Sequence, residues 1–194
     1  MPAMNEPRAL IPIIPRTAPR RAGLTDVQTL RAQARKRLGE GAVTAGYSAD
    51  RTSVLKLLNE ALATEMVCVL RYRRHHFMAR GLDARSTADE FLAHSNEEQG
   101  HADRLAARIV QLGGEPDFSP DSLTVRSHAE YVTGDSLAEM ITEDLVAERI
   151  AIDSYREFIQ YLGDEDPTTS HLLREILAVE EEHASELADL LEGR

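Results

Sequence analysis

The sequence predicts an all-α protein built as a four-helix bundle, with one long crossover connection between the second and third helices. Alanine, leucine, glutamate and arginine dominate from residue 51 onward, a composition typical of long helices. Apolar residues recur there every three or four positions in four segments, and glycine and proline gather between the segments. Of the 194 residues, 42% are hydrophobic, which is enough for the core of one domain with an extension.

Residues 1–50 precede the bundle and divide into a tail, a short helix and a linker. Residues 1–23 hold five prolines, four arginines and a single acid, Glu6. Because proline at this density prevents a helix, we expect an extended or disordered tail. The stretch LTDVQTLRAQARKRL predicts a short helix with Thr25 as its N-cap, and GEGAVTAGYSAD indicates a linker. We therefore separate residues 1–50 from a bundle domain at residues 51–194.

Four long helices follow, and their ends are marked by glycine, proline or a capping residue. The predicted ranges are about 51–80, 86–113, 135–163 and 167–191, with Asp166 as the N-cap of the fourth helix. Short connections join the first two helices and the last two, so each pair should form an antiparallel hairpin. The middle connection of about 20 residues is long for a loop. A helix of about 28 residues spans about 40 Å, however, and a crossover along the bundle needs that reach.

Each predicted helix carries ionisable residues within its apolar stripe. The stripes of the first and third helices are Leu58, Leu62, Glu65, Val69, Tyr72 and Ile141, Leu145, Glu148, Ile152, Tyr155. Those of the second and fourth helices contain Glu-x-x-His and are Phe91, His94, Glu98, His101, Leu105, Ile109 and Leu173, Ile176, Glu180, His183, Leu187, Leu191. The glutamates are 33 residues apart in the first hairpin and 32 in the second. The hairpins therefore look like copies related by a pseudo-two-fold axis.

Four buried carboxylates need partners, because each one carries several kcal/mol of desolvation penalty when it is charged. They could be protonated, paired with arginine or bound to cations, and no stripe offers an arginine at this level. Four carboxylates and two neutral imidazoles carry a charge of −4, which two divalent cations would cancel. Oxygen ligands with one imidazole per metal suit iron or manganese better than zinc. A glutamate from each of two helices plus Glu-x-x-His from the other two is the carboxylate di-iron arrangement.

We predict two metal ions per subunit, iron in the first place and manganese as the alternative. The assigned ligands are Glu65 and Glu148 as terminal carboxylates, Glu98 and Glu180 as bridges, and His101 and His183 as one imidazole per metal. A lone Glu-x-x-His is common on helices, and a single glutamate in an apolar stripe more often has its head in water. Six such residues at matching depths in two repeats are hard to explain as solvated faces.

Further side chains beside the ligands are expected to support them. Asp144 lies four residues before Glu148 and could accept the second N–H of a ligand histidine. Tyr72 and Tyr155 could donate hydrogen bonds to the terminal carboxylates. His94 takes the place of an apolar residue in the other repeat, and we expect a half-buried, hydrogen-bonded histidine there, with a role in iron uptake as the alternative.

Charge and cysteine content exclude several classes of function. The net charge of −11 does not draw the body of the protein to nucleic acid. Cys68 is the single cysteine, which excludes an internal disulfide and a cysteine-rich metal site, and we expect a small core residue.

His75 and His76, near the end of the first helix, are expected to be non-ligands. No apolar run approaches the ~20 residues that cross a bilayer, and no secretory segment is evident, so we expect a cytoplasmic protein without membrane contact.

Four segments resemble the ligand segments of the ferritin superfamily, and those of bacterioferritin most closely. They are LNEALATEMVCVLRY, NEEQGHADR, EDLVAERI and EILAVEEEHASEL, and the resemblance spans roughly residues 54–191. It implies a ferritin-like fold and a ferroxidase that oxidises Fe(II) and stores Fe(III) mineral inside a protein cage. It also places the six residues assigned above on the ligand positions of that family.

Three departures from bacterioferritin refine this expectation. Gln99 stands where bacterioferritins carry their haem-binding methionine, so the resemblance implies no haem. The sequence ends at Arg194 without the fifth helix that helps to build a 24-subunit cage, so a 12-subunit shell like that of the Dps mini-ferritins is favoured. The Dps iron site across a dimer interface is not matched, so the chain resembles the Dps-like subgroup with a bacterioferritin-type site within each subunit. That subgroup often shows a cysteine pair, which this chain cannot supply within a subunit.

Under this resemblance each subunit would oxidise two Fe(II) with peroxide or dioxygen and so protect against oxidative damage. One alternative is a non-storing di-metal oxidoreductase, either a di-iron oxidase or a manganese catalase. Another is a Dps-type protein that binds DNA through its basic tail, although four arginines form only a modest patch and a subunit-contact arm or plain extension is preferred. A metal-free structural bundle is the remaining hypothesis, and it predicts that replacing Glu98 and His101 with alanine leaves the metal content unchanged.

Overall fold

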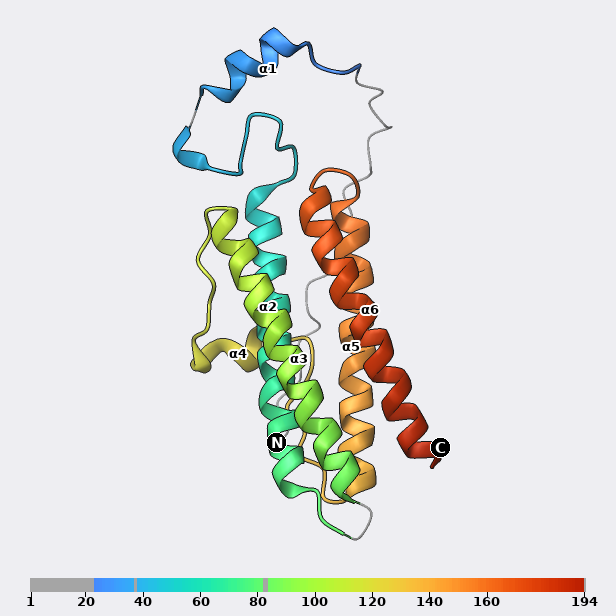
Figure 1. The fold of residues 1–194 in the computed structure, drawn as a ribbon. Helices are drawn as coiled ribbons and strands as arrows, with labels where there is room; N and C mark the ends of the chain where they lie inside the picture. Colours follow the sequence, from blue (N-terminus) through green and yellow to red (C-terminus); the bar gives the residue numbers. More distant parts are fainter. Residues whose placement is uncertain (1–22, 37, 82–83, 194) are drawn as a thin grey trace, which may run out of the picture.

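The computed structural model describes residues 23–36, 38–81 and 84–193, and every regular element in that part of the chain is helical. Four long helices stand side by side as a bundle (Figure 1): α2 Arg51–Met78, α3 Ala84–Gln111, α5 Leu137–Leu162 and α6 Pro167–Glu192. Three short elements complete the described chain: α1 Val27–Ala34, the 3₁₀ turn η1 Leu38–Glu40 and α4 Pro120–Arg126. The predicted all-α bundle with a long crossover between its second and third long helices is confirmed.

Two large apolar clusters lie on either side of a polar layer in the core of the bundle, and a third, small one joins α2 to α4. One cluster joins the first half of α2 and the second half of α5, and includes Leu58, Leu62, Ile109, Phe158 and Leu173. The other lies toward the opposite end of the bundle and includes Cys68, Tyr72, Phe91, Ile141 and Leu187. Because α2 and α3 are antiparallel, as are α5 and α6, all four helices bring their middle turns to the level between the clusters.

The helix ends follow from specific capping contacts. Asp166 caps α6 as predicted, since its Oδ1 accepts from the backbone N–H of Thr169 at 2.9 Å. At α1 the predicted N-cap Thr25 is wrong, because the carboxylate of the next residue, Asp26, accepts from the N–H groups of Gln28 and Thr29, both at 3.0 Å. The N-cap side chain must reach the second and third helical N–H groups, and residue 25 lies one position too early for this.

The crossover connection contains a helix that the sequence did not predict. The seven-residue α4 packs beside α2, and Arg126 at its end donates to the backbone carbonyl of Asn59 on α2 at 3.0 Å. A helix this short is not stable alone, so its formation depends on these tertiary contacts. Further along, Gly134 adopts a φ of +59°, and a Cβ there would lie 2.8 Å from the backbone nitrogen of Met140. Glycine therefore lets the crossover turn tightly into α5.

The N-terminal segment is partly described. The predicted tail, residues 1–23, falls outside the described residues except for Gly23. Helix α1 buries none of its residues and stands away from the bundle (Figure 1). The linker after η1 is fastened to the bundle, because the hydroxyl of Tyr47 donates to Asp166 at 2.9 Å. None of the described helices is both long and apolar enough to cross a membrane.

Candidate metal centre

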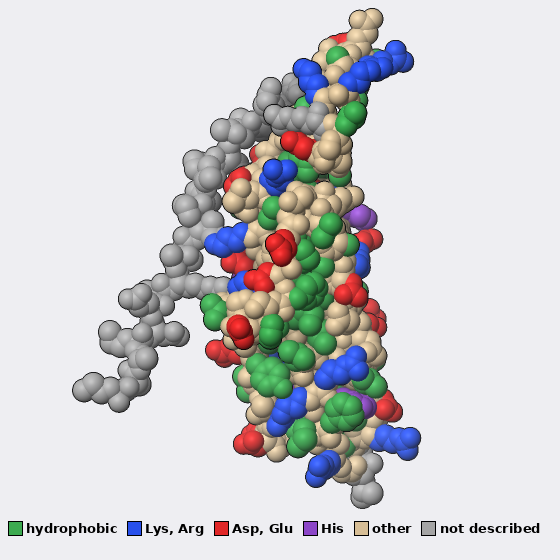
Figure 2. Space-filling view, turned by 90° about the vertical axis from the view of Figure 1, so that its left-hand side faces the viewer, with side chains coloured by type: hydrophobic (Ala, Val, Ile, Leu, Met, Phe, Trp, Pro, Cys, Tyr) green, Lys and Arg blue, Asp and Glu red, His purple; other side chains and the backbone are tan. Residues whose placement is uncertain are grey.

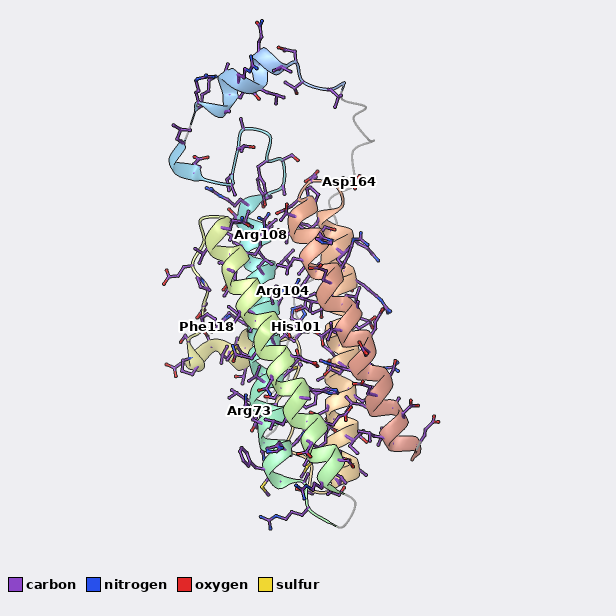
Figure 3. The ribbon with its side chains drawn as sticks, viewed as in Figure 1. Arg73, His101, Arg104, Arg108, Phe118 and Asp164 are labelled. Carbon is purple, nitrogen blue, oxygen red and sulfur yellow. The ribbon has the colours of Figure 1, made fainter. Side chains whose placement is uncertain are left out.

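The six predicted ligands meet in the polar layer at the middle of the bundle. Figure 3 marks this level by His101, about midway along α3. Each long helix contributes from its inward face, and all six residues are buried, with exposed fractions of 5% or less: Glu65 from α2, Glu98 and His101 from α3, Glu148 from α5, Glu180 and His183 from α6. The structure thus brings together every residue that was assigned to the metal site. Their action as ligands stays a prediction.

The six side chains form two overlapping groups whose ligand atoms all lie within 4.8 Å of one another. One group is Glu65, Glu98, His101 and Glu180, and the other is Glu98, Glu148, Glu180 and His183. Glu98 and Glu180 belong to both groups, whereas each of the other residues belongs to one. The predicted roles are two bridging carboxylates between two positions that each have a terminal carboxylate and an imidazole. They would fit this division, and they stay a prediction.

Both histidines point Nδ1 at the carboxylates. The Nδ1 atom of His101 lies 2.9 Å from Glu180 and 3.4 Å from both Glu65 and Glu98. In the same way, the Nδ1 atom of His183 lies 3.2 Å from Glu98, 3.6 Å from Glu180 and 3.8 Å from Glu148. The two positions therefore have nearly the same geometry, as the internal repeat in the sequence predicts.

Despite these short distances, the inward atoms do not have the geometry of hydrogen bonds. Seven buried nitrogen and oxygen atoms have no hydrogen-bond partner within the described chain: Glu65 Oε2, Glu98 Oε1, His101 Nδ1, Glu148 Oε2, both carboxylate oxygens of Glu180, and His183 Nδ1. Buried polar atoms are normally paired, and an unpaired one costs about 1–3 kcal/mol. Oxygen and imidazole nitrogen atoms gathered in this way fit a pair of hard or borderline divalent cations such as Fe(II) or Mn(II).

The electrostatics of the centre favour protons or cations among the carboxylates. Burial and the charge of Glu98 raise the pKa of Glu65 to about 8. Burial and repulsion from Glu98 and Glu180 raise the pKa of Glu148 well above its usual range. Burial lowers the pKa of His183, but the facing carboxylates outweigh this and raise it to about 12. A metal-free centre therefore retains protons, and divalent cations would displace them.

Two tyrosines hold the terminal carboxylates from the opposite hairpin. The hydroxyl of Tyr72 on α2 donates to Glu148 on α5, and the hydroxyl of Tyr155 on α5 donates to Glu65 on α2. These are the hydrogen bonds expected from the sequence. Each bond crosses between the hairpins and fixes one oxygen of the carboxylate, while the second oxygen is buried without a hydrogen-bond partner in the described chain.

Asp144 has different partners from the predicted ones. One carboxylate oxygen accepts from Arg71 Nε at 2.7 Å, and the other lies 2.8 Å from His75 Nδ1. Neither partner is one of the predicted ligand histidines. Arg71 also donates to the backbone carbonyl of Glu130 at 2.8 Å, and His75 Nε2 lies 3.0 Å from that of Thr133. The buried Asp144 therefore ties α5 and α2 to the crossover. Sequence reasoning missed this cluster because Arg71 lies outside the apolar stripe of α2.

Three other residues near the centre can be compared with their predictions. His94 is hydrogen-bonded as expected but fully buried rather than half-buried, because α6 covers it. Cys68 is a buried core residue, as expected. Glu97 was not predicted, yet its carboxylate lies 2.7 Å from Nε2 of His183. The only signal for it in the sequence is the doubled glutamate at residues 97 and 98, where the first residue falls off the apolar stripe.

Comparisons with known proteins agree with this geometry. Residues 55–193 match the ferritin-like domain family. The bacterioferritin of Desulfovibrio desulfuricans is 28% identical over 141 residues, 72% of this chain and 75% of that protein. The DNA protection during starvation protein of Halobacterium salinarum is 29% identical over 160 residues, 79% of this chain and 86% of the relative. A dodecameric thioferritin from Bacteroides fragilis, a bacterioferritin-related protein, superposes with a TM-score of 0.71 at 29% identity, covering 74% of this chain and 87% of that one. The chain belongs to the ferritin-like family, among the relatives of bacterioferritin and Dps.

Proposed function

We propose that the protein is a ferroxidase that oxidises Fe(II) at the centre of each subunit and stores Fe(III) in a homo-oligomeric cage. The observation that carries the proposal is the pair of overlapping ligand groups, whose inward oxygen and nitrogen atoms lack hydrogen-bond partners in the described chain. Two Fe(II) ions are the substrate of this centre. Each ion gives one electron, so a pair matches the two-electron reduction of a peroxide, which takes up two protons and leaves two waters. Dioxygen is the alternative oxidant.

The residues of the chain bind and position this substrate. Glu98 and Glu180 carry the charge that holds two cations close together, and the terminal carboxylates are oriented by Tyr72 and Tyr155. In the metal-free protein, protons balance part of the charge of the four buried carboxylates. Two divalent cations would take the place of these protons and keep the charge of the centre balanced in the dry interior. Manganese in place of iron would use the same ligands and would support the alternative of a non-storing di-metal oxidoreductase.

The surface supports assembly into a cage. The face on the α4 side displays hydrophobic side chains along its length (Figure 2), and Leu70, Phe77, Phe118 and Val125 are among the exposed large hydrophobic residues. Exposed apolar patches of this kind mark protein interfaces. Because the thioferritin from Bacteroides fragilis is dodecameric, we propose twelve subunits rather than 24.

Sedimentation velocity during Fe(II) loading tests this function. The protein is loaded with peroxide or in air, with Fe(II) far beyond two ions per chain. A soluble particle that becomes denser supports a storage cage, and its mass before loading distinguishes 12 from 24 subunits. A monomer or dimer that stops at two metal ions per chain while excess iron precipitates would contradict storage and indicate a di-metal oxidoreductase. As a control, Glu98→Ala should lose uptake, and equal uptake by this variant would refute the centre.

DNA binding is a second candidate function, which rests on the N-terminal segment. Arg31, Arg35 and Lys36 are exposed and lie in or just after α1, a helix that stands away from the bundle (Figure 1). The relative from Halobacterium salinarum is named for DNA protection. The test is electrophoretic retardation of duplex DNA, which should weaken steeply with salt and disappear when residues 1–36 are deleted. Retardation that survives the deletion would exclude this segment.

A further inference from the structure

His75 is completely buried near the end of α2, and both of its ring nitrogens face hydrogen-bond acceptors. Its Nδ1 atom lies 2.8 Å from a carboxylate oxygen of Asp144 on α5, and its Nε2 atom lies 3.0 Å from the backbone carbonyl oxygen of Thr133 in the crossover. Neither an ionised carboxylate nor a carbonyl oxygen can donate. A neutral imidazole has a single N–H group and would leave one bare nitrogen against an acceptor, whereas an imidazolium ion satisfies both contacts.

The charged groups that face His75 place the extra proton on the imidazole ring. Asp144 also accepts a hydrogen bond from the buried Arg71 at 2.7 Å, and this guanidinium group favours the ionised form of the carboxyl. Arg74 opposes an imidazolium ion, because it donates to the same backbone carbonyl as His75, but that contact is exposed and water screens its charge. From α3 the facing ring is the uncharged Phe91, with its centroid 5.6 Å away. The buried contacts therefore outweigh the exposed one.

The Asp144 cluster, formed by Arg71, His75 and Asp144, lies one helical turn from the candidate centre. Arg71 and Tyr72 are adjacent on α2, and their partners Asp144 and Glu148 are one turn apart on α5. Two neighbouring contacts of this kind fix both the height and the rotation of α5 relative to α2. Because residues one turn apart on a helix move together, a shift of Asp144 would carry the carboxylate of Glu148 with it.

The other half of the bundle lacks an equivalent of the Asp144 cluster. The equivalent positions follow from the correspondence of Glu65 with Glu148 in the two related hairpins. They hold small or apolar residues in place of Arg71, His75 and Asp144, namely Ser154, Phe158 and Ala61. Small and apolar side chains thus fill these places in the fold adequately, whereas buried charges carry a desolvation penalty. Packing alone does not account for the cluster, and it supports the terminal carboxylate on one side of the centre only.

We propose that His75 is a positioning residue of the candidate centre, which as an imidazolium ion holds Asp144 and thereby fixes the turn of α5 that carries Glu148. The proposal rests on the proposed function, because it takes Glu148 as a terminal ligand. It applies to one of the two metal positions, the one formed by Glu98, Glu148, Glu180 and His183. The position that contains Glu65 should bind metal independently of His75.

The test compares His75→Gln with the matched control His171→Gln. Glutamine is uncharged, and its one amide nitrogen can replace a single ring nitrogen, whereas the side chain of His171 on α6 is 74% exposed. Both variants keep every residue assigned to the centre, and sedimentation velocity shows whether each assembly is intact. Anomalous scattering from crystals at a series of Co(II) concentrations measures the occupancy of the two positions separately, with Co(II), which is stable in air, in place of Fe(II). Neutron diffraction from wild-type crystals at pH 7 locates the protons of His75 without any variant.

The expected results are a proton on each ring nitrogen of His75 and a selective loss of metal affinity. In His75→Gln the Co(II) affinity of the position that contains Glu148 should fall about tenfold relative to that of the position that contains Glu65. The control should keep the wild-type ratio. A ring nitrogen of His75 without a proton would overturn the imidazolium ion. Unchanged affinities in His75→Gln, or an equal fall at both positions, would overturn the positioning role and indicate a contribution to stability alone.

Stopped-flow kinetics of Fe(II) oxidation separate this inference from the proposed function. Wild type that binds Co(II) at both positions, and shows the selective loss in His75→Gln, but oxidises no Fe(II) would contradict the ferroxidase proposal and support the positioning role. Wild type that oxidises Fe(II), with the same ratio of Co(II) affinities in all three proteins, would support the ferroxidase proposal and overturn the positioning role.

Discussion

The raised pKa of Glu65 predicts that a variant without this carboxyl is more stable than wild type when no metal is bound. In the unfolded chain this carboxyl titrates near 4.5, whereas in the metal-free fold burial and Glu98 raise its pKa to about 8. At pH 7 the carboxyl is ionised in the unfolded chain and protonated in the fold, so folding takes up a proton. The pH lies about 2.5 units above the unfolded pKa, and at about 1.4 kcal/mol per unit this uptake costs about 3 kcal/mol. Glu65→Gln needs no proton and can still accept the hydrogen bond from Tyr155. The variant should be more stable than wild type by about that amount.

Thermal unfolding of chelator-treated protein measures this effect. For a chain of this length about 3 kcal/mol corresponds to a rise of about 6–12 °C in Tm. Folding takes up the proton only between pH 4.5 and about 8, so wild-type stability falls as pH rises through that window and the advantage of the variant should be small at pH 5. Each protein is compared at one concentration, because assembly contributes to stability. Glu182→Gln, at an exposed position, is the control for the loss of one charge and should leave Tm nearly unchanged.

Metal addition gives the second half of the test. With Co(II) in excess the order should reverse, because wild type retains a terminal carboxylate for the ion and the variant does not. A Glu65→Gln protein that is less stable than wild type by the same amount at pH 5 and pH 7 without metal would refute the reasoning. It would mean that the carboxylate is stably charged in the metal-free fold.

Three further predictions follow from the same contacts. Because Glu65 and Glu148 retain protons in the metal-free centre, Co(II) binding should release at least one proton per chain and become tighter as pH rises. Calorimetry in buffers of different ionisation enthalpy measures this release, and a result of no protons released would contradict the prediction. Asp144→Asn leaves the buried Arg71 without its counter-charge and should destabilise the fold by about 3–5 kcal/mol in denaturant unfolding, whereas an effect below 1 kcal/mol would show that the pair is dispensable. Asp166→Ala removes the cap of α6 and also leaves the buried Arg108 without its counter-charge, so it should cost more than the about 1–2 kcal/mol of a cap alone in the same assay, and an unchanged midpoint would refute both roles.

The long helices, and the six ionisable residues that meet between them, could be predicted from the sequence because both depend on a local pattern, whereas the action of the six as ligands stays a prediction. An inward stripe repeats every three or four residues whatever lies opposite, so Glu98 and His101 are recognisable on a single helix. Short or isolated elements were harder. Helix α4 has only seven residues and depends on contacts such as Arg126 with the backbone of α2, which no local pattern reveals.

The sequence by itself determined the bundle, its two related hairpins and the set of ionisable residues at its centre. Only the tertiary structure decided how those residues are shared, with Glu98 and Glu180 in both groups, and which partners the remaining buried charges take. The physical reason is that burial of a polar side chain depends on groups from other helices. Asp144 meets Arg71 across the bundle instead of a ligand histidine, and His94 is closed off by α6. Such contacts span dozens of residues along the chain, so only packing places them.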